Sequence, residues 1–150
     1  MDAGLAANLM NDEHGRTFYD ACAEADVTLV REILASDGKT LLSWKRPGMG
    51  WTPLHVAVEM GHADVVRILI AAGAPIEARN HQGWTPLCLA VDAAIDGAHQ
   101  SGEPLELEII GILLEAGAEA DSPGQEDASP LALARRYGCT PVEDLLVRRP

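Results

Sequence analysis

The sequence predicts an all-α fold made of repeated helix–turn–helix hairpins joined by finger-like loops. Its length of 150 residues suits one domain. Hydrophobic residues make up 47% but aromatic residues only 4%, which is typical of closely packed small helices and not of a β-sandwich. A nine-residue segment, GWTPLHVAV at 50–58, returns as GWTPLCLAV at 83–91 after 33 residues. A repeat of this period indicates stacked hairpins, each one supersecondary unit.

The first helix of each hairpin is predicted to begin at a Thr-Pro pair. The hydroxyl of Thr52 or Thr85 is suited to cap a helix, and the following proline occupies the first helical position, where its missing N–H does no harm. Leu54, Ala57 and Val58 then give this helix an apolar stripe. A looser third copy of the start lies at Ser129-Pro130.

The second helix follows a turn at Gly61 and is predicted over the apolar residues 65–70, ending near Gly73. Its second half returns at 109–118 in the next copy. The two helices form an antiparallel hairpin that cannot bury both of its faces alone. Neighbouring hairpins are therefore expected to stack.

With these motifs the chain resembles the ankyrin-repeat family over about residues 16–147. The resemblance implies an ankyrin-repeat solenoid of four units in a single domain, residues 1–150. The units cover about 16–46, 47–79, 80–123 and 124–147. The first lacks the Thr-Pro start and the fourth stops before another finger loop, so we expect them to be terminal caps.

The third unit contains an 11-residue insertion within residues 93–107, because Thr85 lies 32 residues before Gly117 whereas Thr52 lies 21 before Gly73. The first helix of this unit is able to run on past Asp92. Two interpretations stay open: a surface insertion that is simply tolerated, and a lobe that contacts a partner.

Charge is distributed unevenly. The formal net charge is −12, which disfavours direct binding of nucleic acid. No Lys or Arg occurs from Asn80 to Ala134, where ten acidic residues lie. This acidic stretch is either a solvated surface that aids solubility or a landing zone for a basic partner.

The resemblance also implies a concave binding groove formed by the finger loops and the ends of the first helices. The partner-binding residues that we predict, with those of the acidic stretch, are Met49, Trp51, Glu59, Met60, His81, Gln82, Trp84, Asp92, Asp96, Glu103, Glu106 and Glu126. Ala93, Gln125 and Ala128 occupy further groove positions. The two tryptophans are candidate hot spots, and packing against a neighbouring repeat is their alternative role.

Residues with catalytic potential do not form a recognisable site. The family uses the histidine at the place of His55 as a scaffold residue, and Cys88 stands at that place in the third unit. Cys22, Cys88 and Cys139 have no CxxC spacing and are expected to be buried, reduced thiols. No phosphate-binding glycine motif is present in the sequence. We therefore expect no enzyme activity, no cofactor and no metal.

These features predict a protein that binds another protein with a basic surface. We favour a stand-alone inhibitor, similar to small bacterial immunity proteins that neutralise a toxin, over a non-inhibitory adaptor, with a thiol enzyme as a remote third possibility. The chain contains neither a signal peptide pattern nor a long apolar run. We expect a cytoplasmic monomer without membrane contact.

Overall fold

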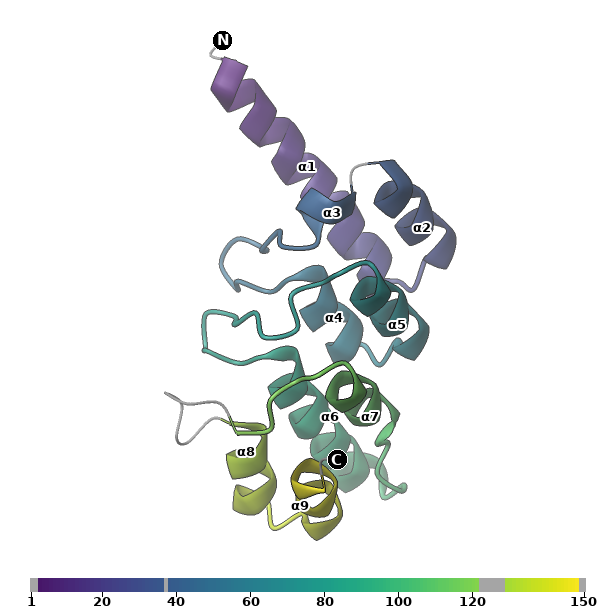
Figure 1. The fold of residues 1–150 in the computed structure, drawn as a ribbon, viewed down its shortest axis with the longest axis vertical. Coiled ribbons are helices and arrows are strands. Elements are labelled where there is room, and N and C mark those ends of the chain that lie inside the picture. The colour runs from purple at the N-terminus through teal and green to yellow at the C-terminus, as the bar shows by residue number, and fades with distance from the viewer. Residues whose placement is uncertain (1–2, 37, 122–128, 149–150) are drawn as a thin grey trace. The chain divides into compact units, whose positions relative to one another are not determined.

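The computed structural model describes residues 3–36, 38–121 and 129–148, without the side chains of 6–9. The described residues form helices and no strand, so the predicted all-α class is confirmed. The chain divides into two units, Met1–Pro75 and Ile76–Pro150. Each unit contains helical hairpins separated by loops (Figure 1).

The first unit holds five helices: α1 (Ala3–Ala23), α2 (Val27–Ser36), α3 (Gly38–Leu41), α4 (Pro53–Glu59) and α5 (Ala63–Ala71). α1 packs against both α2 and α4, and α4 packs against α5. The turn between α1 and α2 places Ala25 in the left-handed conformation, with a φ of 56°. Gly61 has the same conformation between α4 and α5, so both turns use the same backbone geometry.

α1 begins thirteen residues before Arg16, where the repeat pattern starts. The additional segment contains alanine, leucine and methionine and no proline, and such a sequence favours helix without a repeat signature. Leu5 and Met10 are exposed there.

The predicted helix starts are confirmed. Thr52 is the N-cap of α4, and its hydroxyl accepts the backbone N–H of His55 at 3.3 Å. Thr85 and Ser129 cap their helices in the same way, and a proline follows each of the three caps. Each cap satisfies one of the backbone N–H groups left free at a helix start.

The second unit contains α6 (Pro86–Ser101), α7 (Glu108–Glu115), α8 (Pro130–Arg136) and α9 (Thr140–Val147). α6 packs against α7 and α8, and α8 packs against α9. α6 has 16 residues where its counterpart α4 has 7, so the helix does run on past Asp92. Most of the insertion is helix, ending at Gly102 in the left-handed conformation.

Each unit buries apolar side chains between its facing helices. Phe18, Leu54 and Leu69 are fully buried in the first unit. In the second, Leu87 and Leu113 fill the same roles, and Ala94 and Ile95 extend the buried stripe of α6 beyond its counterpart in α4. The helical part of the insertion is therefore anchored to the core and is not a free loop.

Candidate protein-interaction surface

The first finger loop, residues 43–51, is a hairpin-like turn held by backbone hydrogen bonds. The N–H of Arg46 donates to the carbonyl of Trp51, and that of Gly50 donates to the carbonyl of Arg46, both at 2.8 Å. Gly48 and Gly50 have positive φ, which the tight turn requires. The loop projects away from the helices (Figure 1).

Three of the predicted partner contacts in the first unit are exposed: Met49 in the finger loop, and Glu59 and Met60 at the end of α4. Met49 in the loop is 43% exposed and Met60, the C-cap of α4, is 54% exposed. Exposed methionines are costly in water and adapt easily to a partner's surface, so this part of the prediction has suitable chemistry.

Trp51 is half-buried and stacks on the ring of His55, with 6.4 Å between the ring centroids and 28° between the planes. His55 itself is fully buried. The backbone N–H of Thr52 donates to Nδ1 of His55 at 3.1 Å, which completes a reciprocal cap. His55 therefore has the scaffold role that the sequence predicts, and Trp51 has one face committed to packing.

The second finger loop, residues 79–84, is organised by Asn80. Its buried side-chain carbonyl accepts the backbone N–H groups of Gln82 and Trp84 at 2.9 and 3.0 Å. His81 and Gln82 at the tip are exposed, whereas Trp84 is half-buried. This arrangement fixes the loop backbone and leaves the tip residues accessible.

Asp92 differs from the other predicted contacts. It lies inside α6, is half-buried, and accepts a hydrogen bond from the hydroxyl of Tyr137 at 2.9 Å. That bond and the charge of Asp92 raise the pKa of Tyr137. The continued helix replaces the turn that follows α4, so Asp92 and Ala93 do not stand at a helix end as Glu59 and Met60 do.

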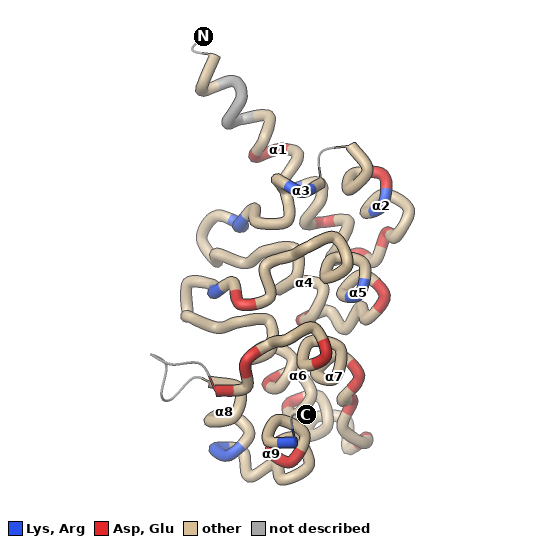
Figure 2. Tube along the Cα trace, in the orientation of Figure 1, with Lys and Arg blue, Asp and Glu red and all other residues tan. Residues whose placement is uncertain are grey.

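Several acidic residues of the stretch Asn80–Ala134 lie on α6, on α7 and in the loop between them (Figure 2). Asp96, Glu103 and Glu106 are all exposed. We call residues 93–107 the acidic lobe. Asp96 accepts a hydrogen bond from the amide of Gln100, and Ser101 accepts the backbone N–H of Glu103, so residues 96–103 of this lobe have local order. Glu126, with Gln125 and Ala128, lies outside the described residues.

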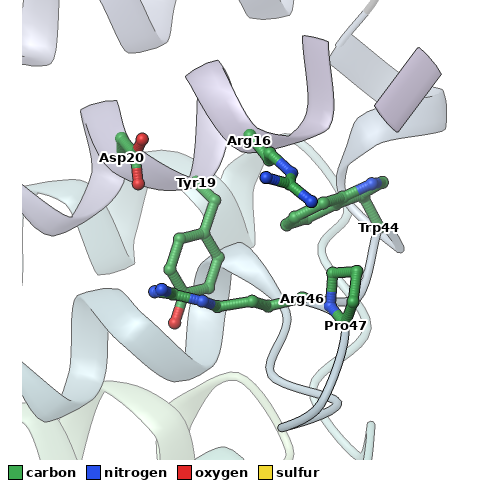
Figure 3. A pocket seen from close by; sticks show the side chains of 6 residues that line it. All are labelled: Arg16, Tyr19, Asp20, Trp44, Arg46 and Pro47. Atoms are coloured by element: carbon green, nitrogen blue, oxygen red, sulfur yellow. The ribbon is translucent and has the colours of Figure 1, made fainter. Parts of the chain in front are cut away.

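Sequence reasoning missed a pocket in the first unit. A cavity of about 290 Å³ is lined by Arg16, Tyr19, Asp20, Trp44, Arg46 and Pro47 (Figure 3). Its residues come from α1 and from the first finger loop. The adjacent Trp44, Lys45 and Arg46 were the available signal, since an aromatic next to two cations in a loop is a common recognition element.

Two of the three thiols, those of Cys22 and Cys88, are buried. Burial raises the pKa of Cys22 to about 12 and also raises that of Cys88, whose Sγ accepts the hydroxyl of Thr85 at 3.3 Å. Cys139 was expected to be buried, but as the N-cap of α9 it is half-exposed. In the described part of the chain, no group of three or more His, Cys, Asp or Glu is placed to hold a metal. None of the described helices is long and apolar enough to cross a membrane.

Comparison with known sequences gives a consistent result. The family described as "Ankyrin repeats (3 copies)" matches residues 18–123. The ankyrin repeat protein YahD of Escherichia coli (strain K12) is 32% identical over 148 residues, which is 98% of this chain and 69% of YahD. The α8–α9 hairpin lies beyond the family match and begins with the same cap and proline.

Two other relatives are larger proteins of which this chain matches a small share. Ankyrin repeat, SAM and basic leucine zipper domain-containing protein 1 of Notamacropus eugenii is 32% identical over 131 residues, or 87% of this chain and 26% of that protein. The human 2-5A-dependent ribonuclease is 36% identical over 81 residues, or 54% of this chain and 11% of the ribonuclease.

Proposed function

The chain belongs to the ankyrin-repeat family, whose repeats bind other proteins, and we propose that it is a stand-alone inhibitor of the immunity type that occludes a basic partner such as a toxin. The observation that supports this most is the acidic lobe at the end of α6, which contains no Lys or Arg and exposes the carboxylates of Asp96, Glu103 and Glu106. We propose a cytoplasmic monomer as the free form. The single-domain organisation of residues 1–150 stays a prediction.

Electrostatics favours a basic partner. Asp96 lies on α6, which is anchored in the core, and Glu103 and Glu106 lie in the short loop that joins α6 to α7, so these exposed carboxylates present a local negative field. Such a field accelerates association with a positive surface and weakens as salt is added, because the screening length falls to about 8 Å at physiological ionic strength. The predicted contacts of the finger loops, Met49, His81 and Gln82, then supply short-range interactions once the partner has docked.

The experiment compares charge variants as baits. Wild type, Glu103→Lys/Glu106→Lys and the control Glu24→Lys/Glu32→Lys are immobilised, and proteins from the native host are captured at low and at high salt. The control pair changes two exposed carboxylates in the first unit by the same total charge. The expected partner is a basic protein that wild type and the control retain, and that the lobe variant and high salt release.

Activity then separates inhibitor from adaptor. The captured partner is assayed alone and with saturating amounts of this chain. Loss of the partner's activity is expected for an inhibitor. Full activity in the complex would contradict inhibition and support the alternative, a non-inhibitory adaptor. A partner that binds wild type and the lobe variant equally, with a flat salt profile, would remove the acidic lobe from the mechanism.

The two tryptophans need a separate test because Trp51 already packs on His55. If Trp51 and Trp84 are hot spots, each change to Ala weakens partner binding by about 2 kcal/mol or more while the thermal midpoint stays close to wild type. A lowered midpoint with unchanged affinity would identify them as packing residues.

A further inference from the structure

The pocket of the first unit is lined by two arginines, Arg16 and Arg46, and by two aromatic rings, Tyr19 and Trp44 (Figure 3). Tyr19, only 3% exposed, lies at the bottom, and Trp44 packs edge-on against it with 5.9 Å between ring centroids. The guanidinium carbon of Arg46 lies 5.3 Å from the centre of the Tyr19 ring. The Arg16 side chain enters from α1 and points toward Trp44.

Each wall of the pocket is held in place by a specific contact. Asp12 accepts the indole N–H of Trp44 at 3.3 Å, and its other oxygen lies 3.6 Å from Arg16. The backbone of Arg46 is fixed by its hydrogen bond to Trp51 in the finger loop. The pocket is therefore preformed, which lowers the entropic cost of binding.

The present interactions of Arg16 and Arg46 allow both side chains to contact a bound anion. Arg16 is 64% exposed at its side chain, and its ion pair with the i–4 carboxylate is long and solvated, which makes that pair weak. Arg46 lies over the ring of Tyr19 and its side chain also hydrogen-bonds the Tyr19 side chain. Burial raises the pKa of that hydroxyl, and the smaller effect of the bond to Arg46 lowers it. The six lining residues carry two positive charges and one negative charge, that of Asp20, and Asp12 adds a second carboxylate beside Arg16. The charges at the pocket are therefore close to balanced, whereas the chain as a whole has a net charge of −12.

Guanidinium groups are planar donors that match a carboxylate, and an aromatic floor suits the methylene groups that carry it. At about 290 Å³ the cavity is at the lower limit for small-molecule sites and fits a single side chain. A polyanion such as nucleic acid is disfavoured because the rest of the chain repels it.

We propose that this pocket receives a glutamate or aspartate side chain from an extended segment of the partner protein. The inference deepens the proposed function and rests on it for the source of the acidic residue. The partner would then make two kinds of contact. Its basic surface would bind the acidic lobe, and one of its acidic side chains would bind Arg16 and Arg46.

The test uses small peptides, so it does not depend on finding the partner. The ¹⁵N-labelled full chain is titrated with acetyl-Gly-Glu-Gly-amide, and the indole N–H signal of Trp44 is followed by NMR. Acetyl-Gly-Gln-Gly-amide is the matched neutral probe, and acetyl-Gly-phosphoserine-Gly-amide separates a carboxylate site from a phosphate site. Arg16→Gln and Arg46→Gln are the test variants, with Arg67→Gln on α5 as the control in the same unit.

The expected result is a saturable shift of the Trp44 signal with the Glu peptide and none with the Gln peptide. Each pocket variant should weaken this binding about tenfold or more, since hydrogen bonds to charged groups are the strong ones, and Arg67→Gln should bind as wild type does. Well-dispersed spectra of the variants confirm that they are folded.

Three outcomes would overturn the inference: no saturable shift with the Glu peptide, equal binding of the Glu and Gln peptides, or much tighter binding of the phosphoserine peptide. Failure here leaves the acidic-lobe mechanism intact, because that mechanism is measured by salt-sensitive capture. Conversely, failure to capture a basic partner leaves the peptide result unaffected.

Discussion

Gly15 lies in α1 directly under the indole of Trp44. A Cβ built at this position would approach three atoms of the indole ring far closer than 3.0 Å, so the ring has to leave its place if Gly15 becomes alanine. Gly97 in α6 offers the matched comparison, because a Cβ there meets nothing within 4 Å. Both glycines are inside helices, so the two substitutions share the same backbone effect.

The expected changes in the free energy of unfolding have opposite signs for Gly15→Ala and Gly97→Ala. Replacing a glycine inside a helix by alanine stabilises it by about 0.5–1 kcal/mol, which is the whole expected effect of Gly97→Ala. At Gly15 that gain is opposed by overpacking, which costs about 1–3 kcal/mol. Displaced, Trp44 also loses its hydrogen bond to Asp12 and its contact with Tyr19. Gly15→Ala should therefore lower the free energy of unfolding by about 1–3 kcal/mol net.

Urea titration followed by the helical circular dichroism signal measures both values. The expected result is a lower midpoint for Gly15→Ala and a higher one for Gly97→Ala. Equal stabilisation of both variants would refute the reasoning, since it would mean that the indole does not rest on Gly15. In that case the pocket walls described above would also be wrong.

Three further predictions concern a cap, a hydrogen bond and a thiol. Thr85→Ala should destabilise the fold by about 1 kcal/mol and lower the thermal midpoint by about 2–4 °C, whereas Thr85→Ser should not, because serine keeps the capping oxygen. Asp92→Asn should bring the pKa of Tyr137 back toward 10.0, as followed by ultraviolet titration; an unchanged pKa would contradict the observed bond. Burial raises the pKa of Cys22 from 9.0 to about 12, so the unfolded chain loses this proton first. The free energy of unfolding should then fall as the pH rises from about 9 toward 12, and a decline equally steep in Cys22→Ala would contradict this origin.

The sequence predicted the helix starts well because they depend on local chemistry. A hydroxyl residue followed by proline satisfies a helix end regardless of what surrounds it, and Thr52, Thr85 and Ser129 all behave in this way. The positive φ of Gly73 and Gly117 likewise places the predicted helix ends. The number of inserted residues was also readable from the sequence, which left their conformation open and indicated only that the first helix was able to continue, as it does to Ser101.

The pocket was not predictable in the same way. Tyr19 and Trp44 are 25 residues apart and belong to the unit without a Thr-Pro start, where no second copy of the motif supports an alignment. Their contact depends on the path of the loop after α3 and on a glycine in α1 that makes room for the indole. The exposure of Cys139 was missed for a related reason, because its place at the start of α9 is set by where the preceding helix stops.

All three tryptophans of the chain, Trp44, Trp51 and Trp84, lie in loops between helices. Tryptophan fluorescence therefore reports on these loops and on their contacts with α1 and α4, whereas the far-ultraviolet signal reports on the helices. A denaturation experiment that records both would show whether the fingers detach before the hairpins melt, without any added label. If the two curves coincide, the projecting loops and the helical hairpins unfold in one cooperative step.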